Sequence, residues 1–388
     1  MARPVVILPQ EDRSLIRYEL GPASPYEPAA EPLRSRVAYA AVHVVADRFA
    51  EHTAVGGARL DWEATLAYRR YLWSMGLSVA EAMDTAQRGM GLDWSACTEL
   101  IRRTAAEAKA VGGALACGAS TDQLPPGKPS LEEIERAYEE QVAFIEDAGA
   151  TVVVMASRHL AASAGGPEDY LRVYEHVLSH ASRPVILHWL GEVFDPHLAG
   201  YWGSRDLDAA AETVVRIARA HAAKIDGIKV SLLDARREIA LREQLQHYDI
   251  RMYTGDDFDY MDLIRGDARG YSHALLGIFD PIAPAASAAI RALDRGQVDA
   301  YEAILRPTLP LSRHIFRAPT YYYKAGIVFL AYLNGHQQHF RMVGGMESAR
   351  SIVHLAQILV LADQARLLRL PDLAAARMRK VLAVAGIE

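Results

Sequence analysis

One lysine lies inside an apolar stretch that ends in a turn and a helix. The stretch reads AAKIDGIKVSLLDARR over residues 222–237; Lys224 precedes the apolar run, and the lysine inside it is Lys229. An ammonium group at the end of a buried strand is partly desolvated, which lowers the pKa of an amine. A neutral amine can attack a ketone and form a Schiff base, an electron sink for making or breaking C–C bonds. The alternative is a structural lysine paired with a carboxylate, Asp256 or Asp257.

Two histidines are candidates for the proton transfer that such chemistry needs. His188 ends the apolar run RPVILHW (183–189), and His159 follows the run TVVVMAS (151–157). Histidine titrates near neutral pH and serves as a general acid or base. The alternative for each is a hydrogen-bonded residue at a strand end.

The elements that would position these residues alternate along the chain. Eight apolar runs are each followed by a segment of helical periodicity between residues 35 and 296. One of these helices begins with Ser130 and Glu133 in capping-box positions. Alternating buried strands and helices are typical of a parallel sheet covered by helices, and eight units favour a closed (β/α)8 TIM barrel. No G-x-G-x-x-G turn follows the first strand, so an open dinucleotide-binding sheet is the weaker alternative.

Two further segments flank the predicted α/β barrel. Residues 1–34 hold two β-like runs around a polar turn, followed by the proline-rich connector PYEPAAEP. Residues 297–388 are mostly helical in pattern. We therefore predict an N-terminal hairpin extension, a barrel over 35–296 and a C-terminal helical extension.

In a barrel of this kind the active site lies at the carboxyl ends of the strands. This rule places Lys229, His188 and His159 at the mouth as catalytic candidates. Carboxylates accept pairs of sugar hydroxyls, and aromatic rings stack on apolar sugar faces. The predicted substrate-binding residues at strand ends are Asp84, Thr85, Arg158, Trp189, Asp256 and Ser272.

The ordered set of segments resembles a known family of barrels. GIKVS (227–231) is similar to the Schiff-base strand of the dihydrodipicolinate synthase / N-acetylneuraminate lyase superfamily of lysine-dependent aldolases. RPVILHWLG (183–191) and YTGDDFDYMDLIRGDARGYSHALLGIFDP (253–281) resemble its fifth strand and its seventh-to-eighth-strand segment. The resemblance extends from about residue 35 to residue 365. It implies an aldolase or lyase that works through an imine at Lys229 without a separate cofactor, in a homodimer or homotetramer.

The sequence also departs from the family pattern. After the second strand it has MDTAQRG (83–89) in place of G-T-T-G-E, the motif that holds the carboxylate of an α-keto acid. Thr85 remains as a hydroxyl, and Asp84 adds a negative charge. The family's tyrosine after strand four is missing from MASRHLAAS (155–163). Within the class of keto-sugar and keto-acid substrates, we therefore expect a keto-sugar or related polyol ketone rather than pyruvate.

Two other functions remain open at this point. A divalent-metal isomerase or lyase would draw ligands from His188, Glu192, Asp256, Asp257 and His273. A barrel that binds a small molecule without catalysis would suit the missing tyrosine. Metal content and sensitivity to a chelator distinguish the first alternative from the imine mechanism.

Composition narrows the class of partner. The chain has 388 residues and a net charge of −6, with no basic stripe of the kind that nucleic-acid binding requires. Its cysteines, Cys97 and Cys117, lack metal-ligand spacing and suit reduced thiols. No apolar run approaches the ~20 residues of a membrane span, and no signal-peptide pattern opens the sequence. We expect a cytoplasmic protein that binds neither nucleic acid nor membrane.

Overall fold

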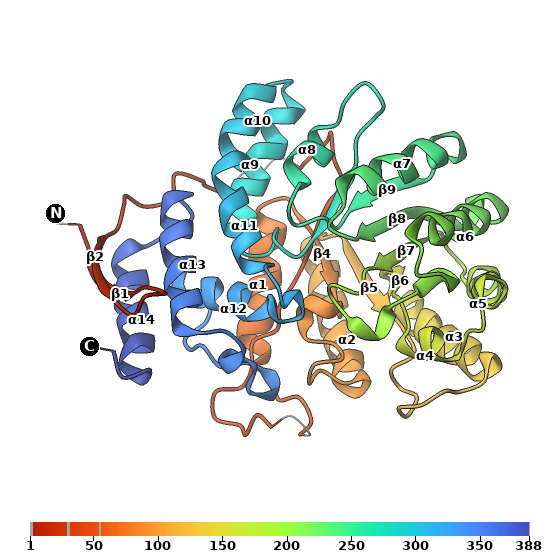
Figure 1. Ribbon diagram of the computed structural model, residues 1–388, viewed down its shortest axis with the longest axis horizontal. Coiled ribbons are helices and arrows are strands. Elements are labelled where there is room, and N and C mark those ends of the chain that lie inside the picture. Colours follow the sequence, from red (N-terminus) through yellow and green to blue (C-terminus); the bar gives the residue numbers. More distant parts are fainter. Residues whose placement is uncertain (1–2, 29–31, 54–55, 388) are drawn as a thin grey trace.

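Eight parallel strands close into a barrel in the computed structural model, which describes residues 3–28, 32–53 and 56–387. Following hydrogen bonds around the ring, the strand order is β10, β3, β4, β5, β6, β7, β8 and β9. The strands are β3 (Ala38–Ala41), β4 (Ser78–Glu81), β5 (Leu115–Ala119), β6 (Thr151–Val154), β7 (Val185–Leu190), β8 (Ile225–Ser231), β9 (Arg251–Thr254) and β10 (His273–Leu276). The predicted TIM-barrel fold is confirmed (Figure 1).

A ring of helices covers the barrel. These are α1 (Trp62–Ser74), α2 (Trp94–Val111), α3 (Leu131–Asp147), α4 (Arg158–Ser163), α5 (Pro167–His180), α6 (Leu207–Ala220), α7 (Ala235–Leu245), α8 (Tyr260–Arg265) and α9 (Ala283–Asp294). The predicted capping box begins α3: the Ser130 side chain accepts from the Glu133 amide, and the Glu133 side chain accepts from the Ser130 amide.

The strands are buried on both faces, which explains their continuous apolar runs. Outward side chains pack against the helices. A separate cluster fills the interior, and neighbours in register share it, such as Ala41 with Ala80 and Val153 with Ile186. Side chains alternate between the two faces, so one residue of register decides which of them reach the interior.

The N-terminal strand pair is present as expected. β1 (Val5–Pro9) and β2 (Leu15–Glu19) are antiparallel, and β1 packs on α13 (Ile352–Gln364) and α14 (Pro371–Val384). In Figure 1 this pair lies at the edge of the molecule beside the C-terminal helices, away from α3 to α7. Of the predicted connector, residues 29–31 fall outside the described part of the chain.

The C-terminal extension folds against the barrel. It consists of α10 (Val298–Leu305), α11 (Leu309–Ile315), α12 (Lys324–Leu333), α13 and α14. Every residue of α12 is buried. Between α11 and α12 the chain brings Phe316 and Tyr323 over the end of β10, where a Cβ on Gly277 would lie 3.0 Å from the Phe316 ring and 3.3 Å from the Tyr323 ring. Glycine at 277 thus allows the extension to pack onto the barrel mouth.

Within the described ranges, no helix combines the length and the apolar composition needed to cross a membrane.

Candidate active site

Lys229 points into the barrel from β8. It pairs in register with His188 on β7 and with Tyr253, an interior residue of β9. Its side chain runs toward the carboxyl ends of the strands, because a Cβ on Gly255, two residues beyond Tyr253, would lie 2.9 Å from Lys229 Cε. The residue is only 4% exposed. The structure therefore places the Lys229 amine inside the barrel, near the carboxyl ends of the strands.

The Lys229 amine is buried without a direct partner among the described residues, although two carboxylates, Asp84 and Asp257, act on it through their charge. Within the described part of the chain it has no hydrogen-bond partner and no carboxylate within ion-pair distance. Burial lowers its pKa, although the charges of Asp84 and Asp257 oppose that effect. Burial likewise raises the pKa of Asp257 well above its ordinary value, against a 2.8 Å hydrogen bond from the Ile278 amide. Both shifts favour the neutral amine that attack on a ketone requires.

A cavity of about 460 Å³ opens at the mouth over β4 to β7. Leu190 and Met155 are part of its apolar wall, and Leu190 pairs with Ser231, two residues beyond Lys229. Lys229 does not line this space. The polar lining residues are Asp84, Arg88, Ser120, Thr121, Asp122, Arg158, His159, Asp195 and His197.

The turn after β4 holds Asp84 and Thr85 beside a tyrosine from the C-terminal extension. Tyr323 donates its phenol proton to Asp84 Oδ2 at 2.7 Å, and Thr85 Oγ1 lies 2.7 Å from the same phenol oxygen. Lys324 Nζ lies 4.0 Å from Asp84 Oδ2. Burial lowers the pKa of Lys324 to about 8, although Asp84 pulls it upward. Nothing in the sequence pattern indicated that the YYYKAG segment contacts a turn more than 230 residues away.

Arg158 and His159 begin α4 and also line the cavity. Arg158 Nε donates to Asp195 Oδ2 at 2.6 Å, and this partner outweighs burial and raises the pKa of the guanidinium. Both ring nitrogens of His159 have partners, Thr121 Oγ1 at 2.9 Å and the Pro125 carbonyl at 3.1 Å. Because a carbonyl only accepts, the Pro125 contact fixes Nε2 as the donor.

Sequence reasoning missed Arg88, which is buried under the cavity. It donates to Asp122 Oδ1 at 2.5 Å, to the Gly118 carbonyl at 2.5 Å and to Gln141 Oε1 at 2.5 Å. The hydrogen-bond donors of Arg88 are therefore engaged in holding the carboxyl end of β5 in place.

His188 lies beside Lys229 but outside the cavity lining. Its Nε2 is 3.2 Å from Ser231 Oγ, and Nδ1 has no partner within the described residues. Burial and then the charge of Lys229 lower its pKa well below 6.5. The imidazole is therefore neutral at neutral pH.

Two predicted substrate-binding residues lie elsewhere, and for them the prediction is wrong. Trp189 follows His188 on β7 and so faces outward, where its ring meets Trp202 edge-on at 6.5 Å. Ser272 precedes β10 at the amino end of the barrel, where its hydroxyl donates to Glu238 Oε1 at 2.7 Å. The sequence pattern did not mark where that last strand begins.

Asp256 follows β9 at the carboxyl end as expected, but it does not line the cavity. Its Oδ1 accepts the amides of Phe258 at 2.9 Å and Asp259 at 3.0 Å, so it closes the local turn. Burial raises its pKa to about 6.

The proposed metal ligands do not gather at the mouth. His273 begins β10 at the amino end, and its Nδ1 accepts the Val37 amide at 2.9 Å. In the described ranges, the histidine, cysteine and acidic side chains close enough to share one ion are Glu139, His176 and His180, on α3 and α5 of the outer wall. The strand-end geometry therefore does not favour the metal mechanism.

A closed eight-stranded parallel barrel is also the fold of several solved structures described as dihydrodipicolinate synthases. The chain superposes on such an enzyme from Aquifex aeolicus with a TM-score of 0.64 at 13% identity, covering 86% of this chain and 99% of that one. A structure of the Acinetobacter baumannii enzyme complexed with pyruvate gives 0.61 at 14% identity, covering 86% and 100%. A monomeric variant gives 0.64 at 15%, covering 88% and 100%. The resemblance in sequence is thus confirmed at the level of fold.

The chain itself belongs to the family DUF993, described as a protein of unknown function, whose model matches residues 6–387. No curated protein matches the sequence.

Proposed function

We propose that this protein is a lysine-dependent aldolase or lyase that forms an imine between Lys229 and a ketone. The observation that carries the proposal is the buried, unpaired amine of Lys229, whose pKa is lowered by burial. A lysine placed for structure alone would be expected to pair with a carboxylate, since burying an unpaired charge is costly. The Acinetobacter baumannii protein, whose barrel has the same fold, is complexed with pyruvate, which is a ketone.

The reaction begins with attack of the neutral amine on the ketone carbonyl. One amine proton and one proton from the solution leave with the carbonyl oxygen as water. The iminium ion that remains keeps the other amine proton and withdraws electrons from the neighbouring carbon. A C–C bond one carbon further along can then break, with its electron pair moving into the iminium to give an enamine. No residue other than Lys229 becomes covalently attached in this scheme.

The cavity suits a polyol ketone better than a keto acid. Its two arginines already face carboxylates, Arg88 with Asp122 and Arg158 with Asp195. A substrate carboxylate would therefore have to compete with an existing ion pair at either position, and Asp84 would repel it. Hydroxyl groups carry no such penalty, and they can donate to Asp84 and the other lining oxygens.

Borohydride reduction tests the proposal. The protein is incubated with dihydroxyacetone, fructose or pyruvate, reduced, and weighed as an intact chain. We expect a mass gain with a keto-sugar, little or none with pyruvate, and no gain in Lys229→Arg, whose side chain is of similar length but cannot form the imine. Trapping of pyruvate alone would overturn the substrate class. No trapping with any ketone by folded protein would overturn the mechanism and favour a binding barrel.

The cellular setting follows from the same proposal. We expect a cytoplasmic homodimer or homotetramer that acts on a small molecule. The imine at Lys229 would take the place of a metal or organic cofactor. Gel filtration with light scattering measures the oligomer, and activity after dialysis against a chelator tests the metal alternative.

A further inference from the structure

We propose that Asp84 carries the proton during the reaction at Lys229, and that Tyr323 from the C-terminal extension positions it. This inference rests on the proposed function. It assigns the proton transfer to a carboxylate after β4 rather than to the two histidines that the sequence suggested.

Asp84 presents one free oxygen to the cavity. Its side chain is 15% exposed and lines the space, and its Oδ2 is held by Tyr323 at 2.7 Å with Lys324 at 4.0 Å. Within the described residues, Oδ1 has no hydrogen-bond partner. That oxygen is therefore available to a substrate proton.

The other carboxylates of the lining are occupied by arginines. Asp122 accepts from Arg88 with both oxygens, at 2.5 and 2.9 Å. Asp195 accepts from Arg158 through one oxygen and lies 3.1 Å from the ring of His197 through the other. A carboxylate held by a guanidinium is a poor proton acceptor, so Asp84 is the best placed of the three.

The histidines are less suited to the step. Burial lowers the pKa of His188 well below 6.5, so its imidazole accepts a proton poorly, and both nitrogens of His159 are engaged by Thr121 and Pro125. Asp84 lines the cavity, and its charge raises the pKa of the Lys229 amine against the effect of burial.

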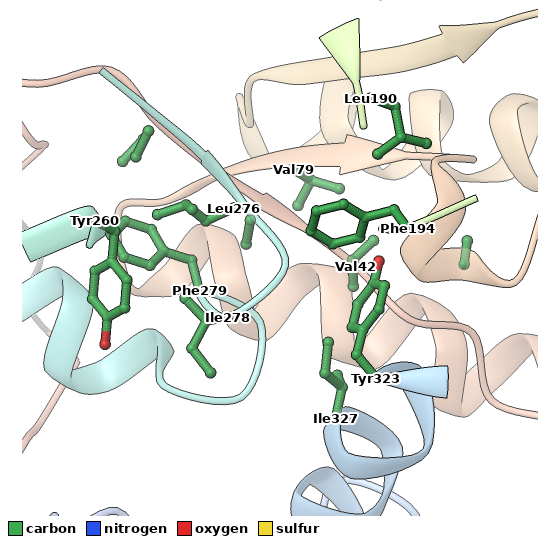
Figure 2. Close-up of a cluster of buried hydrophobic side chains, with 14 of the residues drawn as sticks. Val42, Val79, Leu190, Phe194, Tyr260, Leu276, Ile278, Phe279, Tyr323 and Ile327 are labelled. Atoms are coloured by element: carbon green, nitrogen blue, oxygen red, sulfur yellow. The ribbon is translucent and has the colours of Figure 1, made fainter. Parts of the chain in front are cut away.

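Tyr323 is built to hold Asp84 in one orientation. Its ring stacks on Phe316 at 4.4 Å, and its phenol oxygen lies 2.7 Å from Thr85 Oγ1. Burial raises its pKa well above 10, so the phenol keeps its proton and acts as the donor to Asp84. Figure 2 shows the Tyr323 side chain rising from the start of α12 toward Val42 and Phe194 at the mouth.

In the cleavage direction the step balances as follows. The Asp84 carboxylate takes the proton of the substrate hydroxyl, and the electrons of that O–H bond form the carbonyl of the departing aldehyde. The electron pair of the broken C–C bond moves into the iminium and gives the enamine on Lys229. The Asp84 carboxylic acid then returns the proton to the enamine carbon, and water releases the ketone and the free amine.

Deuterium exchange separates proton transfer from imine formation. Dihydroxyacetone, or pyruvate if only pyruvate is trapped, is incubated with the protein in D2O. Loss of the proton next to the carbonyl is followed by NMR, and imine formation by borohydride trapping. In Asp84→Asn we expect trapping within about threefold of wild type and exchange slower by about 10²- to 10⁴-fold. In Tyr323→Phe we expect normal trapping and exchange slower by about tenfold, the typical effect of losing one hydrogen bond to a charged group.

The matched control is Tyr322→Phe, which removes a neighbouring phenol that has no hydrogen bond to Asp84, and it should exchange at the wild-type rate. Wild-type exchange in Asp84→Asn would overturn the inference while leaving imine formation intact. Wild-type exchange in Tyr323→Phe would overturn the positioning role. Absence of trapping in the wild type would overturn the proposed function, and this inference with it.

Discussion

At the scale of single residues, Lys229 depends on a missing side chain at position 255. A Cβ there would lie 2.1 Å from Ser231 Oγ, 2.9 Å from Lys229 Cε and 2.9 Å from the Val230 carbonyl oxygen. Real carbon atoms do not approach so closely, so an added methyl group must displace its neighbours. The glycine in the YTGDD segment thus keeps the path of the lysine side chain open.

We predict that Gly255→Ala slows imine trapping at Lys229 by at least about tenfold, because the amine can no longer reach its present position. The rate of borohydride trapping measures the effect, with urea unfolding to follow stability. Gly166→Ala is the control, since nothing lies within 4 Å of a Cβ at that position. Equal trapping rates in the two variants would show that Gly255 does not shape the lysine site.

The residues at the mouth were only partly predictable. Strand counting places four residues correctly, because they lie within five residues of the carboxyl end of a barrel strand: Asp84, Thr85, Arg158 and His159. Side chains alternate between the two faces of a strand, so Trp189, which follows the inward-facing His188, faces outward. Sequence alone does not fix that register.

At the scale of elements, the segment between α11 and α12 closes one side of the mouth. Phe316 and Tyr323 stack at 4.4 Å, and Phe194, from the loop after β7, meets Tyr323 edge-on at 6.0 Å. These rings come from two regions of the chain, and their contact joins the C-terminal extension to the barrel. Helical periodicity predicted the extension but not its contact with the site, because periodicity reports one buried face and not its partner.

Removing the Phe316 ring tests how much this aromatic contact contributes to stability. We predict that Phe316→Ala lowers the free energy of unfolding by about 3–5 kcal/mol, because it leaves a cavity in a fully buried cluster. Urea unfolding measures the change. Phe49→Ala, at a ring that is 85% exposed, should change stability by less than about 0.5 kcal/mol. A small effect at Phe316 would mean that the extension is held by its helices alone.

At the scale of the whole molecule, the pH dependence of stability reflects a buried acid on α7, Glu238, which bonds to Ser272 just before β10. Glu238 is buried and accepts from Ser272 through Oε1, while Oε2 has no partner within the described residues. Burial, with Asp256 as a further cause, raises its pKa from 4.5 to about 8.

The raised pKa of the Glu238 carboxyl determines whether stability rises or falls with pH. Between pH 4.5 and about 8 the folded protein keeps a proton that the unfolded chain releases. Stability therefore falls as pH rises through that window, by up to about 1.4 kcal/mol per pH unit. We predict that Glu238→Gln removes this part of the slope, as measured by urea unfolding at several pH values. Glu63→Gln, at a side chain that is 88% exposed, should follow the wild type. Parallel curves for wild type and Glu238→Gln would contradict the prediction.

The barrel as a whole was predictable because its evidence is repeated eight times along the chain. Each apolar run and each capped helix supports the same architecture, so a misjudged strand end such as that before Ser272 does not alter it. The site lacks that redundancy. Tyr323 and Arg88 contact the site through residues far apart in sequence, and neither their residue type nor their spacing predicts this.

The most direct measurement is peptide mapping of the reduced adduct. The chain carries two buried amines near the mouth, Lys229 and Lys324, and only the first lacks a hydrogen-bonded partner among the residues described. After incubation with dihydroxyacetone, fructose or pyruvate and reduction by borohydride, we predict that the added mass lies on the Lys229 peptide. A label on Lys324, or no label in folded protein, would contradict the account.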